Sequence, residues 1–168
     1  MRSGGRALLL FIMLAGVATL AGVAAGPAAA RRLLHAGTYW AAFERAPGTC
    51  EAVGRSELQA APGRAQARAA FAFARDRSRR GQLHILLSRP ARPGSDALLV
   101  IGESSFLLAT RGPSAWSRGP AQEQAILAAV RRAGEMRVRA QGVGGRISDR
   151  YLLAGAPTAI DAAAIACA

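Results

Sequence analysis

Lysine is absent from this chain of 168 residues, so all 22 of its basic residues are arginines. A phosphate-binding P-loop needs a lysine, and that class of nucleotide site is therefore excluded. Exclusive use of arginine is typical of a GC-rich genome, so the number of arginines is by itself weak evidence for guanidinium chemistry. Ten acidic residues leave a formal net charge of +12, which favours anionic partners.

Histidine is also scarce, because His35 and His84 are the only two in the chain. No cluster of His, Cys, Asp and Glu has the spacing of a metal site, and we predict neither a metal nor a cofactor. No Gly-x-Ser-x-Gly elbow occurs, and we predict no catalytic residues and a protein that is not an enzyme. A small periplasmic hydrolase that uses His84 with Ser88 or Asp149 is the less favoured alternative.

The first thirty residues have the anatomy of a secretory signal peptide. Arg2 and Arg6 precede an uncharged block over residues 7–25, and Ala28 and Ala30 supply the small residues that signal peptidase requires before a cut after Ala30. The alternative is a retained inner-membrane anchor, because the uncharged block just reaches spanning length. Both interpretations place the remainder of the chain in the periplasm.

Export narrows the set of partners. Nucleic acid is excluded in that compartment, and the anionic partners that remain are envelope lipids and acidic glycans. Apart from such binding, contact with a membrane is expected only through residues 1–30, and only if they stay uncleaved.

Cysteine occurs twice, at Cys50 and Cys167, and both positions follow the candidate signal. An even number of cysteines in an exported protein predicts a disulfide, which would bring the C-terminus back to the start of the domain. Closing a loop of more than a hundred residues stabilises a fold by roughly 4–5 kcal/mol in the chain-entropy model. Two unpaired thiols are the alternative.

Alternating apolar and polar residues predict a mainly β fold, an antiparallel β-sandwich-like domain with two short helices behind the N-terminal signal or anchor helix. One helix is expected from Pro120 to Gly134. The other is expected from about Thr158, with Thr158 and Asp161 as a capping box and Cys167 on its inner face. The expected strands are residues 50–58, 67–75, 82–89, 97–101, 104–110, 135–141 and 147–155.

The domain organisation follows from these elements. Residues 1–30 form the signal or anchor, residues 31–47 a lead-in, and residues 48–168 a single disulfide-closed β-rich domain. Within the lead-in, Tyr39, Trp40 and Phe43 are expected to close one end of the core.

One turn carries the densest positive charge. Arg75, Arg77, Arg79 and Arg80 are the candidate residues for an anionic lipid or glycan. No aromatic residue interrupts this run, and a solvated turn at the end of a strand is the alternative.

Several blocks resemble the invasion-associated locus B family of exported alphaproteobacterial proteins, in particular its sphingomonad-type members. They are "GTYWAAFERAPGTCEAVGRSE", "RRGQLHILLSR", "LLVIGESSFLLAT", "EQAILAAVRRAGEMRV" and "YLLAGAPTAIDAAAIACA", which together cover about residues 40–168. The resemblance implies a small exported β-sandwich-like protein with no catalytic motif, whose recurrent positions match Trp40, Cys50, residues 159–161 and Cys167. We therefore expect a non-enzymatic accessory protein of the cell envelope that acts by surface interaction, or else an arginine-rich module for anionic lipid or glycan.

Overall fold

The computed structural model describes residues 31–167, which form ten β-strands and two α-helices. The strands are β1 (Arg32–Ala36), β2 (Trp40–Ala46), β3 (Thr49–Arg55), β4 (Arg68–Ala74), β5 (Arg80–Leu86), β6 (Ala97–Ile101), β7 (Ser104–Arg111), β8 (Ser114–Trp116), β9 (Glu135–Gly142) and β10 (Gly145–Leu152). The helices are α1 (Pro120–Val130) and α2 (Ala156–Cys167).

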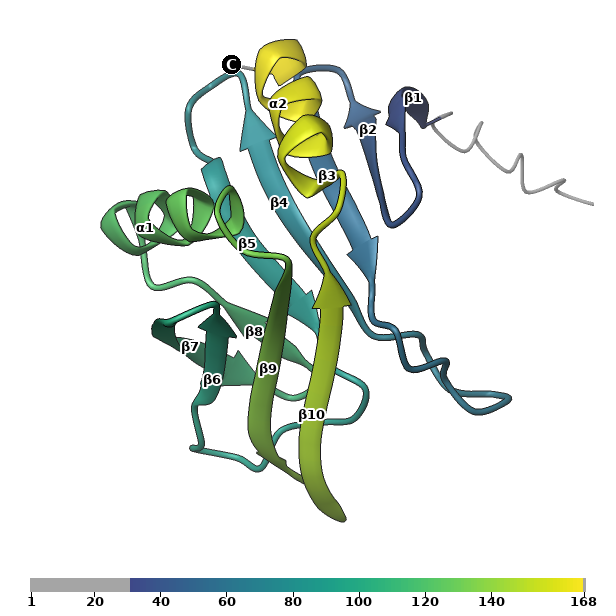
Figure 1. Cartoon of the computed structure of the whole chain (residues 1–168), viewed down its shortest axis with the longest axis vertical. Coiled ribbons are helices and arrows are strands. Elements are labelled where there is room, and N and C mark those ends of the chain that lie inside the picture. Colours follow the sequence, from purple (N-terminus) through teal and green to yellow (C-terminus); the bar gives the residue numbers. More distant parts are fainter. Residues whose placement is uncertain (1–30, 168) are drawn as a thin grey trace, which may run out of the picture.

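All neighbouring strands are antiparallel, and their order is β1-β2-β3-β4-β5-β8-β7-β6-β9-β10. The sheet changes layer at β7, because residues 109–111 of that strand pair with β8 whereas residues 104–108 pair with β6. One layer therefore contains β1–β5 and β8, and the other contains β6, β9 and β10 (Figure 1). The mainly β, sandwich-like fold predicted from alternation is confirmed.

Both layers and both helices contribute to one hydrophobic core. Trp40, Phe71 and Leu83 are fully buried on the inner face of the first layer, and Leu99 and Val138 are fully buried on the second. Figure 1 shows α2 lying across β2–β4 and α1 beside β5. Neither helix packs on the outer face of β1–β5, so this face can contact other molecules.

Three strands were not expected from the sequence. Residues 31–47 are not a lead-in but supply β1 and β2, which pair with each other and then with β3. The strand β8 lies in a segment expected to be irregular. Each of these strands lacks clean alternation or is only three residues long, and pairing with neighbours, rather than a local pattern, makes them extended.

Trp40 is the aromatic residue of this region that enters the core, with 1% of its surface exposed. Its indole Nε1 donates a hydrogen bond to the carbonyl of Leu152, at 2.8 Å, which ties β2 to the end of β10. Gly54 makes room for the ring, because a Cβ at that position would lie 2.5 Å from Trp40 Cε2. Tyr39, by contrast, is 46% exposed.

The predicted disulfide is confirmed. Cys50 on β3 is bonded to Cys167 at the end of α2, with a Cα–Cα distance of 5.7 Å. Cys167 faces the core together with Ile160, as the helical spacing predicted, and both cysteines are fully buried. The bond fixes α2 against β2 and β3 and closes a loop of 117 residues.

The helix ends differ from the sequence prediction. Helix α1 ends at Val130, four residues before Gly134. Helix α2 begins at Ala156, because Gly155 adopts a φ of +82° and its carbonyl accepts the amide hydrogen of Ala159 in the first turn. The capping box at Thr158 and Asp161 is therefore wrong, and the Asp161 carboxylate instead accepts a hydrogen bond from Arg131.

Within residues 31–167, no helix has the length and apolar character needed to cross a bilayer. The candidate signal or anchor, with Ala28 and Ala30 at its cleavage site, lies outside the described residues.

Candidate functional site

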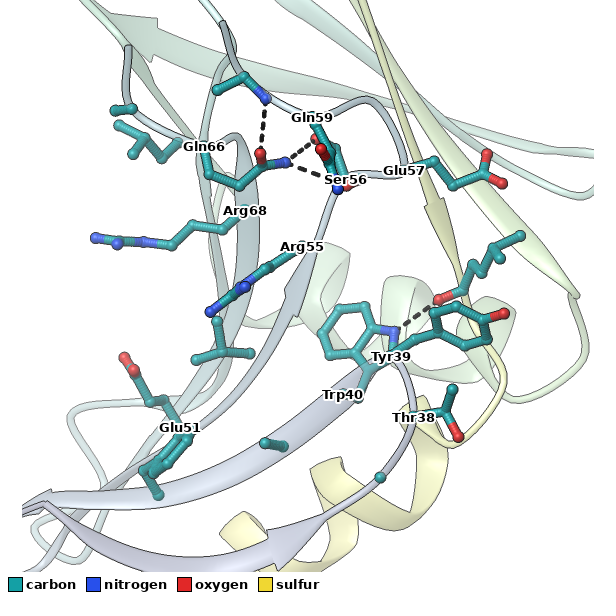
Figure 2. A pocket seen from close by; sticks show the side chains of 18 of the residues that line it. Thr38, Tyr39, Trp40, Glu51, Arg55, Ser56, Glu57, Gln59, Gln66 and Arg68 are labelled. Carbon is teal, nitrogen blue, oxygen red and sulfur yellow. Dashed lines mark hydrogen bonds between the residues drawn. The ribbon is translucent and has the colours of Figure 1, made fainter. Parts of the chain in front are cut away.

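The outer face of β2–β5 forms the floor of a groove of about 1130 Å³ (Figure 2). Side chains alternate between the two faces of a strand, and this alternation decides which residues face the groove. On β3, Cys50 and Ala52 point into the core, so Glu51, Val53 and Arg55 point outward. On β4, Phe71 points inward and Arg68 points outward. The groove is therefore lined by the outward-facing residues of each strand.

Arg55 and Arg68 are the central feature of the groove. They are register partners across the β3–β4 pair, so their Cβ atoms lie within roughly 5 Å of each other. Like charges placed directly opposite on a sheet repel and destabilise it. Figure 2 shows both side chains extending toward the same side of the groove, where both are exposed.

Among residues 31–167, no carboxylate forms an ion pair with either of these arginines. Of the other two arginines that line the groove, Arg31 forms no ion pair within residues 31–167, whereas Arg45 is compensated. Arg45 forms an ion pair with Glu51 on the neighbouring strand. Arg150 pairs with Glu57, which lines the groove, at 2.9 Å. Uncompensated positive charge at the groove therefore lies on Arg31 and on the Arg55–Arg68 pair, and only the last two face each other across the sheet.

The floor beside this pair is apolar. Ala41, Phe43, Val53 and Leu86 line it, and each is half-buried. Tyr39 stands at the opposite side of the groove, next to Trp40 (Figure 2). The groove therefore combines a cationic pair with half-buried apolar side chains and one exposed aromatic ring.

One rim of the groove is the loop over residues 56–67, which is held by a single glutamine. The Gln66 Oε1 atom accepts a hydrogen bond from the amide of Ala60 at 2.8 Å. Its Nε2 atom donates to Ser56 Oγ at 2.9 Å and to the carbonyl of Leu58 at 3.0 Å. These bonds fix the loop against the first residues after β3.

The arginines that the sequence singled out lie elsewhere. Arg75, Arg77, Arg79 and Arg80 are exposed on the turn between β4 and β5, at the opposite end of β4 from Arg68. Asp76 lies among them, and hydrogen bonds from Ser78 hold the pKa of its carboxyl below the usual value. This basic turn (residues 75–80) does not line the groove.

The hydrolase residues are not brought together. His84 faces outward, away from the neighbouring core residues, and its Nε2 lies 3.1 Å from Ser114 Oγ. Asp149 is buried and accepts the backbone amide hydrogen of Ser88 at 2.9 Å. Burial lowers the pKa of His84, and the positive charge of Arg68 lowers it further. Among residues 31–167, no three His, Cys, Asp or Glu side chains gather as a metal site.

No known protein family, characterised protein or solved structure matches this chain in the comparisons. The resemblance to the invasion-associated locus B family accordingly stays a prediction from the sequence blocks quoted above.

Sequence reasoning missed the Arg55–Arg68 pair. Both residues lie within or beside expected strands, but thirteen positions separate them and neither belongs to a run of charge. The signal that could have found them is the register of the hairpin: once residues 50 and 73 are paired, residues 55 and 68 must also pair.

Proposed function

We propose that this chain is an exported, non-enzymatic accessory protein of the cell envelope that binds an acidic glycan in the groove, with Arg55 and Arg68 as its contact residues. The observation that carries the proposal is the direct opposition of two exposed arginines without a carboxylate partner in the described chain. A bound sulfate, phosphate or carboxylate would remove the repulsion between them.

The chemistry of arginine fits this role. Each guanidinium presents a planar fork of donors that matches the two oxygens of a carboxylate or phosphate group, and such charge-assisted bonds are roughly twice as strong as neutral ones. An exposed aromatic face such as that of Tyr39 offers a surface on which a sugar ring can lie. The ordered rim lowers the entropy lost on binding.

Export is supported by two independent features. Residues 1–30 have the charge and apolar pattern of a signal peptide. The Cys50–Cys167 disulfide belongs to the oxidising compartment to which such a signal leads. We propose the periplasm as the location, with the domain either free or held by an uncleaved N-terminal segment.

Binding is favoured over hydrolysis by the position of His84. A triad requires a serine nucleophile and a carboxylate on the two nitrogens of one imidazole. Here the buried Asp149 is engaged by a backbone amide in the core, whereas His84 lies on the outer face.

The proposal can be tested with a heparin-type sulfated oligosaccharide, whose charge does not change over the working pH range. Calorimetry on the disulfide-bonded chain from Arg31 onward should compare the double variant Arg55→Gln/Arg68→Gln with the control Arg92→Gln/Arg111→Gln. The control arginines are exposed and lie outside the groove lining, so both variants remove the same net charge.

We expect the groove variant to lose at least about tenfold in affinity, since each charge-assisted hydrogen bond contributes about 1.5–3 kcal/mol. The control should lose less than about threefold at moderate salt, where distant exposed charges are screened. Equal losses in both variants, or no binding by the wild-type protein at low salt, would contradict the proposal.

A further inference from the structure

One end of the domain gathers four segments that are distant in the sequence, and we call it the entry end. It comprises the start of β1, the turn at residues 46–48, the basic turn (residues 75–80) and the last turn of α2. Strand pairing joins Arg32 to Glu44 and Thr49 to Ala74. The amide of Arg75 donates a hydrogen bond to the carbonyl of Gly48, at 2.9 Å, and so ties the two turns together.

The entry end has a large excess of positive charge. Six exposed arginines stand on it, namely Arg31, Arg32, Arg75, Arg77, Arg79 and Arg80. Two carboxylates lie among them, and both are locally engaged. Glu44 accepts a hydrogen bond from Arg32 at 2.8 Å, and Asp76 accepts the amide hydrogen of Ser78 at 2.9 Å. The four arginines of the basic turn form no ion pair within residues 31–167.

Large apolar side chains are exposed beside this charge. Ile165, in the last turn of α2, is 83% exposed, and Leu33, next to Arg32 on β1, is 54% exposed. The disulfide from Cys167 to Cys50 fixes the end of α2 at the beginning of β3. Arginines together with exposed aliphatic side chains are the combination that a lipid headgroup region accommodates, because phosphates meet the charges while the apolar groups insert.

The path of the chain points to the same surface. The uncharged block ends at residue 25, and the first described residue, Arg31, is at the entry end. Six residues span at most about 20 Å when fully extended. If the block is retained in a bilayer, the entry end is therefore held close to the lipid surface.

We propose that the entry end is a docking surface for an anionic phospholipid bilayer. Charge complementarity supports it, and the point of chain entry adds to this support where residues 7–25 are retained in a bilayer. The groove pair lies at the far end of the same strands, six residues along β3 from Thr49 to Arg55, or about 20 Å. Docking would thus leave Arg55 and Arg68 about 20 Å from the membrane and free to bind. Arg31 lies at the edge of both surfaces, but the basic turn does not line the groove, so this inference does not depend on the proposed glycan site.

The test uses the disulfide-bonded chain from Arg31 onward, because residues 31–167 share one continuous core. Binding to vesicles of phosphatidylglycerol and phosphatidylcholine is compared with binding to phosphatidylcholine alone, by sedimentation at low salt. The docking variant replaces Arg75, Arg77, Arg79 and Arg80 by glutamine. The matched control makes the same change at four exposed arginines outside the entry end, namely Arg92, Arg111, Arg139 and Arg146.

A basic residue at an anionic lipid surface changes partitioning about fivefold. We expect the docking variant to lose at least about thirtyfold in binding to phosphatidylglycerol vesicles, and the control to lose about threefold or less. The variant Ile165→Ser should bind phosphatidylglycerol vesicles a few-fold more weakly than the wild type at high salt, where the apolar contribution to binding dominates.

Equal losses in the docking variant and the control would overturn the inference, because net charge alone would then explain the binding. Absence of binding to the anionic vesicles at low salt would also overturn it. So would arginine-dependent binding of a soluble polyanion to the basic turn without any binding to vesicles. The variant Arg55→Gln/Arg68→Gln should bind vesicles like the wild type, which separates this result from the outcome for the glycan site.

Discussion

The two ends of β4 present arginines in two different ways. At one end, the basic turn places four arginines within six consecutive residues, all exposed and none opposite another arginine across the sheet. At the other end, Arg68 faces Arg55 directly, although twelve residues lie between them in the chain. Density of charge in the sequence reveals the first arrangement, whereas only strand register reveals the second.

The two arrangements also differ in how strongly their arginines repel one another. In the basic turn, the side chains can spread into water, so their mutual repulsion is screened. In the groove, the backbone fixes the two Cβ atoms close together, and the repulsion is a fixed cost of the fold. The groove retains this repulsion, and no carboxylate of the described chain offsets it. It is therefore a stronger candidate than the basic turn for the site of a specific anionic ligand.

The largest expected effect concerns the disulfide, which lies near the basic-turn end of β3. The double variant Cys50→Ser/Cys167→Ser should lose about 5 kcal/mol in the free energy of unfolding, because the loop of 117 residues is no longer closed in the unfolded chain. Urea denaturation under non-reducing conditions measures this loss. A loss below about 1 kcal/mol would show that the cross-link contributes little to either end of the sheet.

The next effect concerns the packing that supports the groove. Gly54→Ala should lower the free energy of unfolding by about 1–3 kcal/mol, because the new Cβ would meet the Trp40 ring. Gly134→Ala is the matched control, since a Cβ there meets nothing within 4 Å. Similar melting temperatures for Gly54→Ala and the control would contradict the close approach of β3 to the indole.

A smaller effect of opposite sign distinguishes the two arginine arrangements. Arg68→Gln should raise the free energy of unfolding by about 0.2–1 kcal/mol, because it removes the repulsion from Arg55. Arg79→Gln, in the basic turn, should leave stability nearly unchanged. Chemical denaturation at low salt compares the two. A destabilised Arg68→Gln variant would indicate that the arginine makes a favourable contact within the fold.

The smallest effect is a difference in acid sensitivity. The hydrogen bond from Arg32 holds the pKa of Glu44, at the entry end, below its usual value of 4.5. Because the folded pKa is depressed, this stabilisation is complete above about pH 4.5 and is lost as the pH falls through the folded value. Stability curves for the wild type and Glu44→Gln should converge in acid.

How much the sequence revealed depended on the kind of signal. Strong alternation, as in Leu83 and Ile85 or in Met136 and Val138, predicted strands that the structure confirms. The disulfide was predictable because an even number of cysteines in a protein with an export signal indicates that they are paired. The strands β1, β2 and β8 were not predictable, since they owe their extended form to neighbours rather than to their own pattern.

The candidate site was less accessible than the fold. The basic turn was found because its charges are adjacent, yet it does not line the groove. The groove pair required the exact partner of each residue across a hairpin whose loop extends over residues 56–67. A shift of one residue in that register would turn one arginine toward the core, so an approximate strand prediction cannot identify the pair.

The central claim is that Arg55 and Arg68 hold the anionic ligand. The most direct measurement follows the side-chain Nε–Hε resonances of assigned arginines by nuclear magnetic resonance during titration with the sulfated oligosaccharide. The account predicts that the resonances of Arg55 and Arg68 shift together and saturate, while those of Arg75, Arg77, Arg79 and Arg80 change little. Saturable shifts at the basic turn, with Arg55 and Arg68 unaffected, would contradict it.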